Sequence, residues 1–152
     1  MITDENSNSK YNRMKTKELY QKIKIKASPA KVYNAFMNEK QHQAFTGQSA
    51  KIENKKGGRF ATCGDQNYGY TIFLDKGKRI IQAWTLKDFP DNRYSIIDIT
   101  LNETNKGYTE LNFHQSGIPN EFVKHLKNGW KAVYWKPLKA YLEKGIKQPL
   151  KQ

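Results

Sequence analysis

The segment from Pro119 to Lys144 most constrains what this chain can fold into, because its pattern is typical of one long amphipathic helix. Its apolar residues recur at steps of three and four, which gathers them on one face of a helix with 3.6 residues per turn. Lysines occupy much of the remaining surface. A helix with one wide apolar face must pack against another layer of the fold. The apolar positions are Phe122, Leu126, Trp130, Val133, Tyr134, Leu138, Tyr141 and Leu142.

The segments that precede this helix predict the layer against which it packs. Tyr20 to Ala27 alternates lysine with apolar residues, the two-residue period of a strand with one exposed and one buried face. Short connections rich in Gly, Pro, Asn and Asp separate the later strand-like runs, so neighbouring strands must pair antiparallel. The later strands are predicted at about 49–54, 58–63, 68–75, 79–87, 94–102 and 108–116.

Two short helices are predicted between the first strand and the others. Ser28 offers an N-cap oxygen, and Pro29 suits the first helical position, where no N–H is needed. A second short helix covers Glu39 to Phe45, and Gly47 ends it. One strand, two short helices, a run of strands and a long closing helix form an α+β order with the helix on one face of the sheet.

The length of the chain, 152 residues, suits one hydrophobic core but not two. We expect a mobile polar arm at 1–17, a single domain at 18–146 and a flexible basic tail at 147–152. Because Cys63 is the single cysteine, no intramolecular disulfide can form. Proteins without disulfides are typical of the reducing cytoplasm. No run approaches the roughly 18 apolar residues that a membrane span needs. The sequence therefore predicts a cytoplasmic protein without a membrane span.

The charge balance favours an acidic partner. The chain has 27 basic and 14 acidic residues, a net charge of +13. Only four of the basic residues are arginine, the side chain best suited to reading bases, so nucleic acid is not the expected partner. The lysine bias is equally consistent with an A/T-rich genome. The candidate partner-binding residues are Lys22, Lys24 and Lys26 on one strand face and Lys124, Lys127 and Lys131 on the closing helix.

No group of residues predicts catalysis. The three histidines, His42, His114 and His125, lack the spacing of a metal site, and His114 is predicted to face solvent. Cys63 lies in a turn with no histidine near it in sequence. No phosphate-binding loop of the GxxxxGK type occurs. We therefore predict no catalytic residue, no metal and no cofactor, and expect a protein that is not an enzyme.

Apolar and aromatic residues on the strands and the closing helix are compatible with two interiors. They fill the core completely, or they line a cavity that holds an apolar small molecule. The sequence leaves these two readings equal. The candidate cavity residues are Tyr70, Ile72, Trp84, Ile97, Ile99, Leu111, Phe113, Trp130 and Tyr134.

Several short motifs follow one another along residues 19–142. They are Ser28-Pro29 with Val32, Ala35 and Phe36; Gly57-Gly58-Arg59-Phe60; Trp84 before Phe89-Pro90; Tyr94-Ser95; Thr109-Glu110-Leu111; Gly117-Ile118-Pro119; and Gly129-Trp130 with Tyr134, Trp135 and Leu138-Lys139. In this order the chain resembles the C-terminal domain of the activators of the heat-shock protein 90 ATPase, within the START and birch-pollen-allergen helix-grip superfamily.

That resemblance implies a helix-grip fold, a curved antiparallel sheet of about six or seven strands wrapped around the long C-terminal helix. It also implies a non-enzymatic co-chaperone-like module that binds a heat-shock protein 90 type chaperone and stimulates or modulates its ATPase. The alternative is a START-like protein that holds a hydrophobic small molecule or lipid under the C-terminal helix. Within that helix, Gly129 is expected to permit close approach or leave cavity space, and Pro137 to cause a kink.

Overall fold

The computed structural model describes residues 15–151, which form an antiparallel sheet with helices against one face. The strand order is β1-β7-β6-β5-β4-β3-β2, so the first and last strands of the chain pair with each other. This confirms the predicted α+β fold and the antiparallel pairing of the middle strands. The strands are β1 (Thr16–Ile25), β2 (Lys51–Ile52), β3 (Arg59–Thr62), β4 (Asn67–Asp75), β5 (Arg79–Leu86), β6 (Ser95–Glu103) and β7 (Thr109–Pro119).

The predicted polar arm falls almost entirely outside the described residues, which begin at Lys15. Strand β1 starts at Thr16, within the last two residues of that predicted arm. At the other end of the chain, the predicted tail holds two backbone hydrogen bonds. The N–H of Gln148 donates to the carbonyl of Ala44, and that of Lys151 donates to Gly47. In this structure the tail therefore lies against the end of the second short helix.

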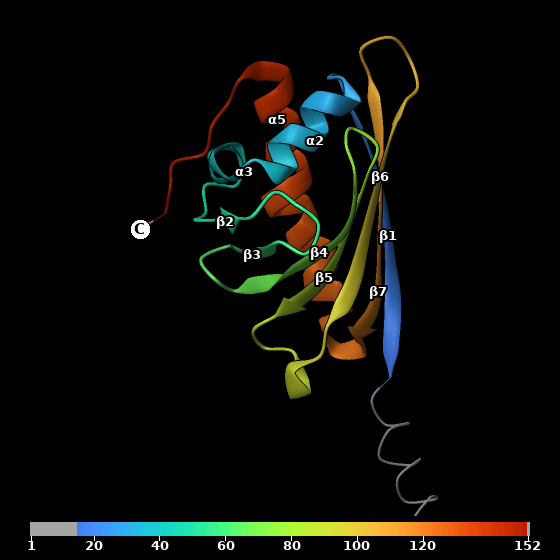
Figure 1. The fold of residues 1–152 in the computed structure, drawn as a ribbon, viewed down its shortest axis with the longest axis vertical. Coiled ribbons are helices and arrows are strands. Elements are labelled where there is room, and N and C mark those ends of the chain that lie inside the picture. The colour runs from blue at the N-terminus through green and yellow to red at the C-terminus, as the bar shows by residue number, and fades with distance from the viewer. Residues whose placement is uncertain (1–14, 152) are drawn as a thin grey trace, which may run out of the picture.

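Two short helices, α2 (Pro29–Met37) and α3 (Glu39–Thr46), lie together near one end of the sheet (Figure 1). Ser28 Oγ accepts a hydrogen bond from the N–H of Lys31, which caps α2 as predicted. Gly47 ends α3 with a φ of 70°, a left-handed conformation that costs glycine little. Both helices bury their apolar faces in the core.

The C-terminal segment is helical throughout but is not one regular helix. It runs along one face of the curved sheet (orange to red in Figure 1). A turn of 3-10 helix leads into α4 (Val123–Gly129), a π-helical segment η3 (Trp130–Trp135) and α5 (Lys136–Lys144). The N–H of Lys136 donates to Lys131, five residues back, as in a π-helix. The irregularity therefore lies directly before Pro137, whose ring supplies no N–H.

The π-helical turn explains why one large buried residue was absent from the predicted apolar face. In a π-helix, residues five apart lie about one turn apart and share a face. Trp130 and Trp135 consequently stack, with ring centroids 5.4 Å apart and planes 15° from parallel. A regular 3.6-residue period would have turned Trp135 away from the sheet.

Aromatic side chains pack closely against the inner side of Trp130. Its ring centroid lies 4.5 Å from that of Phe113, 4.7 Å from Tyr134 and 5.6 Å from Trp84. Its indole N–H donates to Gln115 Oε1 at 2.9 Å. The void beside Trp84 and Trp130 measures only about 10 Å³, room for roughly one water. Between sheet and helix, the centre of the molecule is filled.

Alanine substitutions at two glycines are expected to change the free energy of unfolding in opposite directions. A Cβ on Gly129 would meet no atom within 4 Å, whereas one on Gly69 would lie 1.9 Å from the carbonyl oxygen of Ala83. Gly129→Ala should raise the free energy of unfolding by about 0.5–1 kcal/mol, because alanine favours the helix. Gly69→Ala should lower it by about 1–3 kcal/mol through overpacking. Urea denaturation measures both, and a destabilising Gly129→Ala would contradict the open space at this position.

Candidate functional site

A basic groove runs between strand β1 and the C-terminal helical segment. Its volume is about 530 Å³. Its residues come from two parts of the chain that are more than 100 positions apart, so only the fold assembles it. They are Tyr20, Gln21, Lys22 and Ile23 from β1 and Lys127, Lys131, Trp135, Lys136 and Lys139 from the helix, and together they define the basic groove.

Gln21 joins the two walls of the basic groove. Its amide nitrogen donates to the carbonyl of Lys127 at 3.0 Å, and its amide oxygen accepts the indole N–H of Trp135 at 2.6 Å. Both polar ends of this side chain are therefore satisfied within the protein. The bonds hold the helix in register with β1 and position the lysines on either side.

The basic groove carries an excess of positive charge. Within residues 15–151, no carboxylate forms an ion pair with Lys127, Lys131 or Lys136. Lys22 lies 3.9 Å from Glu110, a long contact, and Lys139 lies 2.7 Å from Glu143. A concave surface with several unpaired cations attracts anionic partners.

The structure brings together only part of the predicted partner-binding set. Lys22, Lys127 and Lys131 line the basic groove, while Lys124 lies one turn before its helical wall. Lys24, near the end of β1, and Lys26, just after it, are exposed and lie beyond the groove. The sequence prediction missed Lys136 and Lys139. Their helical spacing from Lys131 is a signal, but the π-helical turn shifts the face on which they lie.

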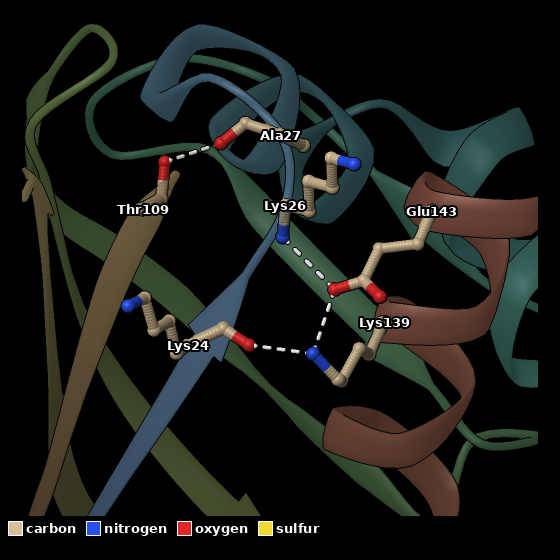
Figure 2. Close-up of polar contacts among 6 residues, drawn as sticks. All are labelled: Lys24, Lys26, Ala27, Thr109, Lys139 and Glu143. Carbon is tan, nitrogen blue, oxygen red and sulfur yellow. Dashed lines mark hydrogen bonds and ion pairs between the residues drawn. The ribbon is translucent and has the colours of Figure 1, made fainter. Parts of the chain in front are cut away.

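At one end of the basic groove, side chains from α5 cap the edge of β1 (Figure 2). The ammonium of Lys139 donates to the carbonyl of Lys24 at 2.9 Å, and the N–H of Lys26 donates to Glu143 Oε2 at 2.9 Å. Lys139 and Glu143 also pair with each other. These bonds satisfy backbone groups that an edge strand otherwise leaves free.

A second concave site lies beside the helix and borders the filled centre, because Trp84, Trp130 and Tyr134 belong to both. It is a pocket of about 410 Å³, a size that suits a small organic molecule. Three of the predicted cavity residues, Trp84, Trp130 and Tyr134, line it. We call it the side pocket. Its other residues are Gln48, Cys63, Gln66, Asn67, Leu86, Asp88, His125, Leu126, Gly129 and Val133.

A chain of polar side chains extends from the side pocket into the core. His42 Nδ1 lies 2.8 Å from the carbonyl of Phe36, so Nδ1 carries the proton and donates it. The other ring nitrogen then accepts the Tyr134 hydroxyl at 2.9 Å. Cys63 Sγ lies 3.7 Å from that hydroxyl. No histidine lies near Cys63 in the sequence, and only the fold links it to His42, through Tyr134, which is 71 residues away from Cys63.

Burial keeps this polar chain neutral. It lowers the pKa of His42 to about 4, against an ordinary value of 6.5. It also raises the pKa of the Cys63 thiol and that of Tyr134. A neutral thiol is a poor nucleophile, so the arrangement does not activate Cys63 for covalent catalysis. It can offer a ligand neutral hydrogen-bonding groups.

The buried His42 makes stability depend on pH. As pH falls below 6.5, the unfolded state takes up a proton that the folded state refuses until about pH 4. The free energy of unfolding should therefore fall by about 2 kcal/mol between about pH 7 and pH 5 from this group. Urea denaturation of the wild type and of His42→Gln across this range tests it. Equal pH slopes for the two proteins would refute the assignment.

The remaining predicted cavity residues do not line the side pocket. Ile97, Ile99, Leu111 and Phe113 are buried in the filled core. Tyr70 and Ile72, in contrast, are each 44% exposed, so their assignment to a cavity was wrong.

The error lies in the phase of β4. Its inward positions are the small residues Gly69 and Thr71, because Ala83 and Phe60 approach too closely for a side chain at 69. The aromatic residues face outward instead. A register shift between Thr71 and Phe73 further disturbs the alternation.

Two negative findings apply to the described part of the chain. Among residues 15–151, no three His, Cys, Asp or Glu side chains gather closely enough to hold a metal ion. No helix in the same range has the length and apolar character to cross a membrane.

Comparison with known proteins gives consistent matches. The family model described as "Activator of Hsp90 ATPase homolog 1-like protein" matches residues 26–143. The activator of 90 kDa heat shock protein ATPase homolog of Dictyostelium discoideum is 32% identical over 116 residues, which are 76% of this chain and 30% of that protein. Homolog 1 of Homo sapiens is 30% identical over 112 residues, 74% of this chain and 33% of that protein. The chain thus spans about a third of the length of these curated relatives.

A solved structure agrees in fold. The crystal structure of an HSP90 activator from Plasmodium falciparum matches with a TM-score of 0.76 and 21% identity. The match covers 82% of this chain and 95% of that one. The curved sheet and the long C-terminal helix are therefore shared.

Proposed function

We propose, since this chain belongs to the family of Activator of Hsp90 ATPase homolog 1-like proteins, that it binds a heat-shock protein 90 type chaperone and stimulates its ATPase. The family match over residues 26–143 carries the proposal. The names of the relatives point to a 90 kDa heat shock protein as the partner. The basic groove offers a surface suited to an acidic partner.

Stimulation requires a difference in affinity between two states of the chaperone. A protein that binds the closed, ATP-competent state tighter than the open state shifts the population toward it. A tenfold preference shifts that equilibrium by about 1.4 kcal/mol, and a preference of about 10⁴ takes it from almost fully open to almost fully closed. The chain itself need not carry out any bond-breaking step.

The charge of the basic groove predicts how binding depends on salt. Clustered lysines accelerate encounter with an acidic surface, and dissolved ions screen that attraction over about 10 Å at 0.1 M. We expect the association rate to fall as salt rises, with a smaller change in the dissociation rate.

Titration calorimetry with the full-length chaperone of the same organism tests the proposal. The measurement is made at about 0.05 M and about 0.15 M salt, with ATP analogue and without nucleotide. We expect binding at low salt, weaker binding at the higher salt and tighter binding with the analogue. An absence of binding at low salt in both nucleotide states would refute the proposal.

The side pocket favours a second function, the binding of a small apolar molecule. Its walls include Trp84, Leu126 and Val133, and Asn67 and Tyr134 supply polar groups. Gln48, Gln66, Asp88 and His125 add further polar groups, and a concave pocket that combines apolar walls with polar groups is typical of small-molecule sites. Native mass spectrometry of the purified protein tests this function. A bound mass that disappears in Gly129→Trp, which fills the pocket, would support it, and no bound mass in the wild type would count against it.

A further inference from the structure

Strand β1 is an edge of the described sheet, with β7 on one side only. It is ten residues long, whereas the strand at the opposite edge, β2, has two. A long edge strand presents N–H and C=O groups that can pair with another strand. The edge is therefore open only where these backbone groups of β1 have no hydrogen-bond partner.

Backbone groups of alternate residues of β1 point away from β7. The carbonyl of Lys24 and the N–H of Lys26 face α5, where Lys139 and Glu143 bind them (Figure 2). The pairing of β1 with β7 keeps one register from Leu19 to Ile25. The groups of Tyr20 and Lys22 consequently point the same way as those of Lys24.

At Tyr20 and Lys22 the edge is open. Within residues 15–151, no side chain or backbone group outside the β1–β7 pairing bonds to the backbone of either residue. The same stretch forms one wall of the basic groove. The open backbone groups and the unpaired lysines of the helix thus border one concavity.

The chemistry of this concavity specifies its occupant. An added strand would bond to the free backbone groups of Tyr20 and Lys22. Its side chains would alternate, and acidic ones would meet Lys131 and Lys136, which lack a carboxylate partner in the described chain. The alternate, apolar ones would lie on the opposite face of the sheet, beside the exposed ring of Tyr20. Opposite charges across the groove favour a segment rich in Asp or Glu.

We propose that this edge binds an acidic, extended segment of the chaperone as an added β-strand in the basic groove. The inference rests on the proposed function for the source of the segment. Lys139 and Glu143 end the added strand, because they occupy the next backbone groups of β1. Affinity then comes from main-chain hydrogen bonds and specificity from charge.

A pair of peptides separates strand addition from simple charge attraction. The probe is a fluorescein-labelled peptide of about nine residues with alternating glutamate and valine, a usual strand length. One version is N-methylated on its valines and another on its glutamates, so both have equal charge. Only one set of amides can face β1. Their dissociation constants, from fluorescence anisotropy, should differ by about tenfold or more. Equal constants would overturn the inference.

Variants of the protein provide an independent test of strand addition. Lys22→Pro removes the open N–H but no bond to β7, and Lys22→Gln removes only the charge. We expect the proline variant to bind the unmethylated peptide about fivefold more weakly than the glutamine variant. Lys131→Glu should weaken it too, and Lys106→Glu, an exposed turn residue with the same change in charge, should not. Equal binding by the Lys22 variants would contradict strand addition.

Binding of the chaperone to the wild type and to the Lys22 variants distinguishes the two proposals. If it binds the wild type, and binds Lys22→Pro and Lys22→Gln equally, the strand-addition inference is wrong and the proposed function stands. If it does not bind the wild type at all, the proposed function is wrong. The methylated peptides still decide whether the edge accepts a strand in that case.

Discussion

Replacing Trp130 by alanine is expected to lower the free energy of unfolding by about 3–5 kcal/mol, the range for a buried tryptophan. Trp130 contacts the rings of Trp84, Phe113 and Trp135 at the centre of the filled core. The substitution would leave a space beside these rings, and the cost of that space adds to the lost burial of the indole. Gln115, whose amide oxygen accepts the indole N–H, would also lose its partner.

Trp130→Phe serves as the matched control for this prediction. It keeps an aromatic ring but loses the N–H donor to Gln115, so it should cost less than the alanine variant. Chemical denaturation with far-ultraviolet circular dichroism measures both. A loss below about 1 kcal/mol for Trp130→Ala would mean that the centre of the molecule is not packed as described.

Reversing three charges in the basic groove should weaken chaperone binding on the order of 100-fold at low salt. The variant is Lys127→Glu, Lys131→Glu and Lys136→Glu together. Each reversal replaces an attraction of up to about 1 kcal/mol by repulsion, and every 1.4 kcal/mol is a factor of ten. The effect should shrink at physiological salt, because ions screen exposed charges. Titration calorimetry against the full-length chaperone measures it.

The matched control reverses three exposed lysines of the turns, Lys55, Lys76 and Lys106, which lie outside the basic groove. It has the same net charge as the groove variant but should keep most of the wild-type affinity. If the two variants lose affinity equally, overall charge rather than the basic groove attracts the partner. That outcome would contradict the assignment of the site.

Much of the fold was predictable because local patterns dominate it. Turn residues set the strand boundaries, and the capping signals of Ser28 and Gly47 set the short helices. The long apolar stripe set the closing helix. Its π-helical turn was not predictable, since the 3.6-residue period gives no indication of a five-residue step. That step brings Trp135 into the core.

The sites were harder to predict, because they depend on contacts between distant segments. The strand phase at Tyr70 and Ile72 is set by the close approach of Ala83 to Gly69, which period-two reasoning cannot detect. His42 looked unremarkable in sequence and meets Tyr134 only in the fold. The basic groove was half predicted for the same reason. Its lysines are visible along the chain, but their grouping depends on how the helix crosses β1.

The most direct test of the proposed function is the ATPase rate of the same organism's heat-shock protein 90, with and without this protein, at low and physiological salt. We expect the protein to raise the rate at low salt, and to raise it less as salt screens the basic groove. A rate that does not change at either salt concentration, although the chaperone is active alone, would contradict the assignment of this chain as an activator.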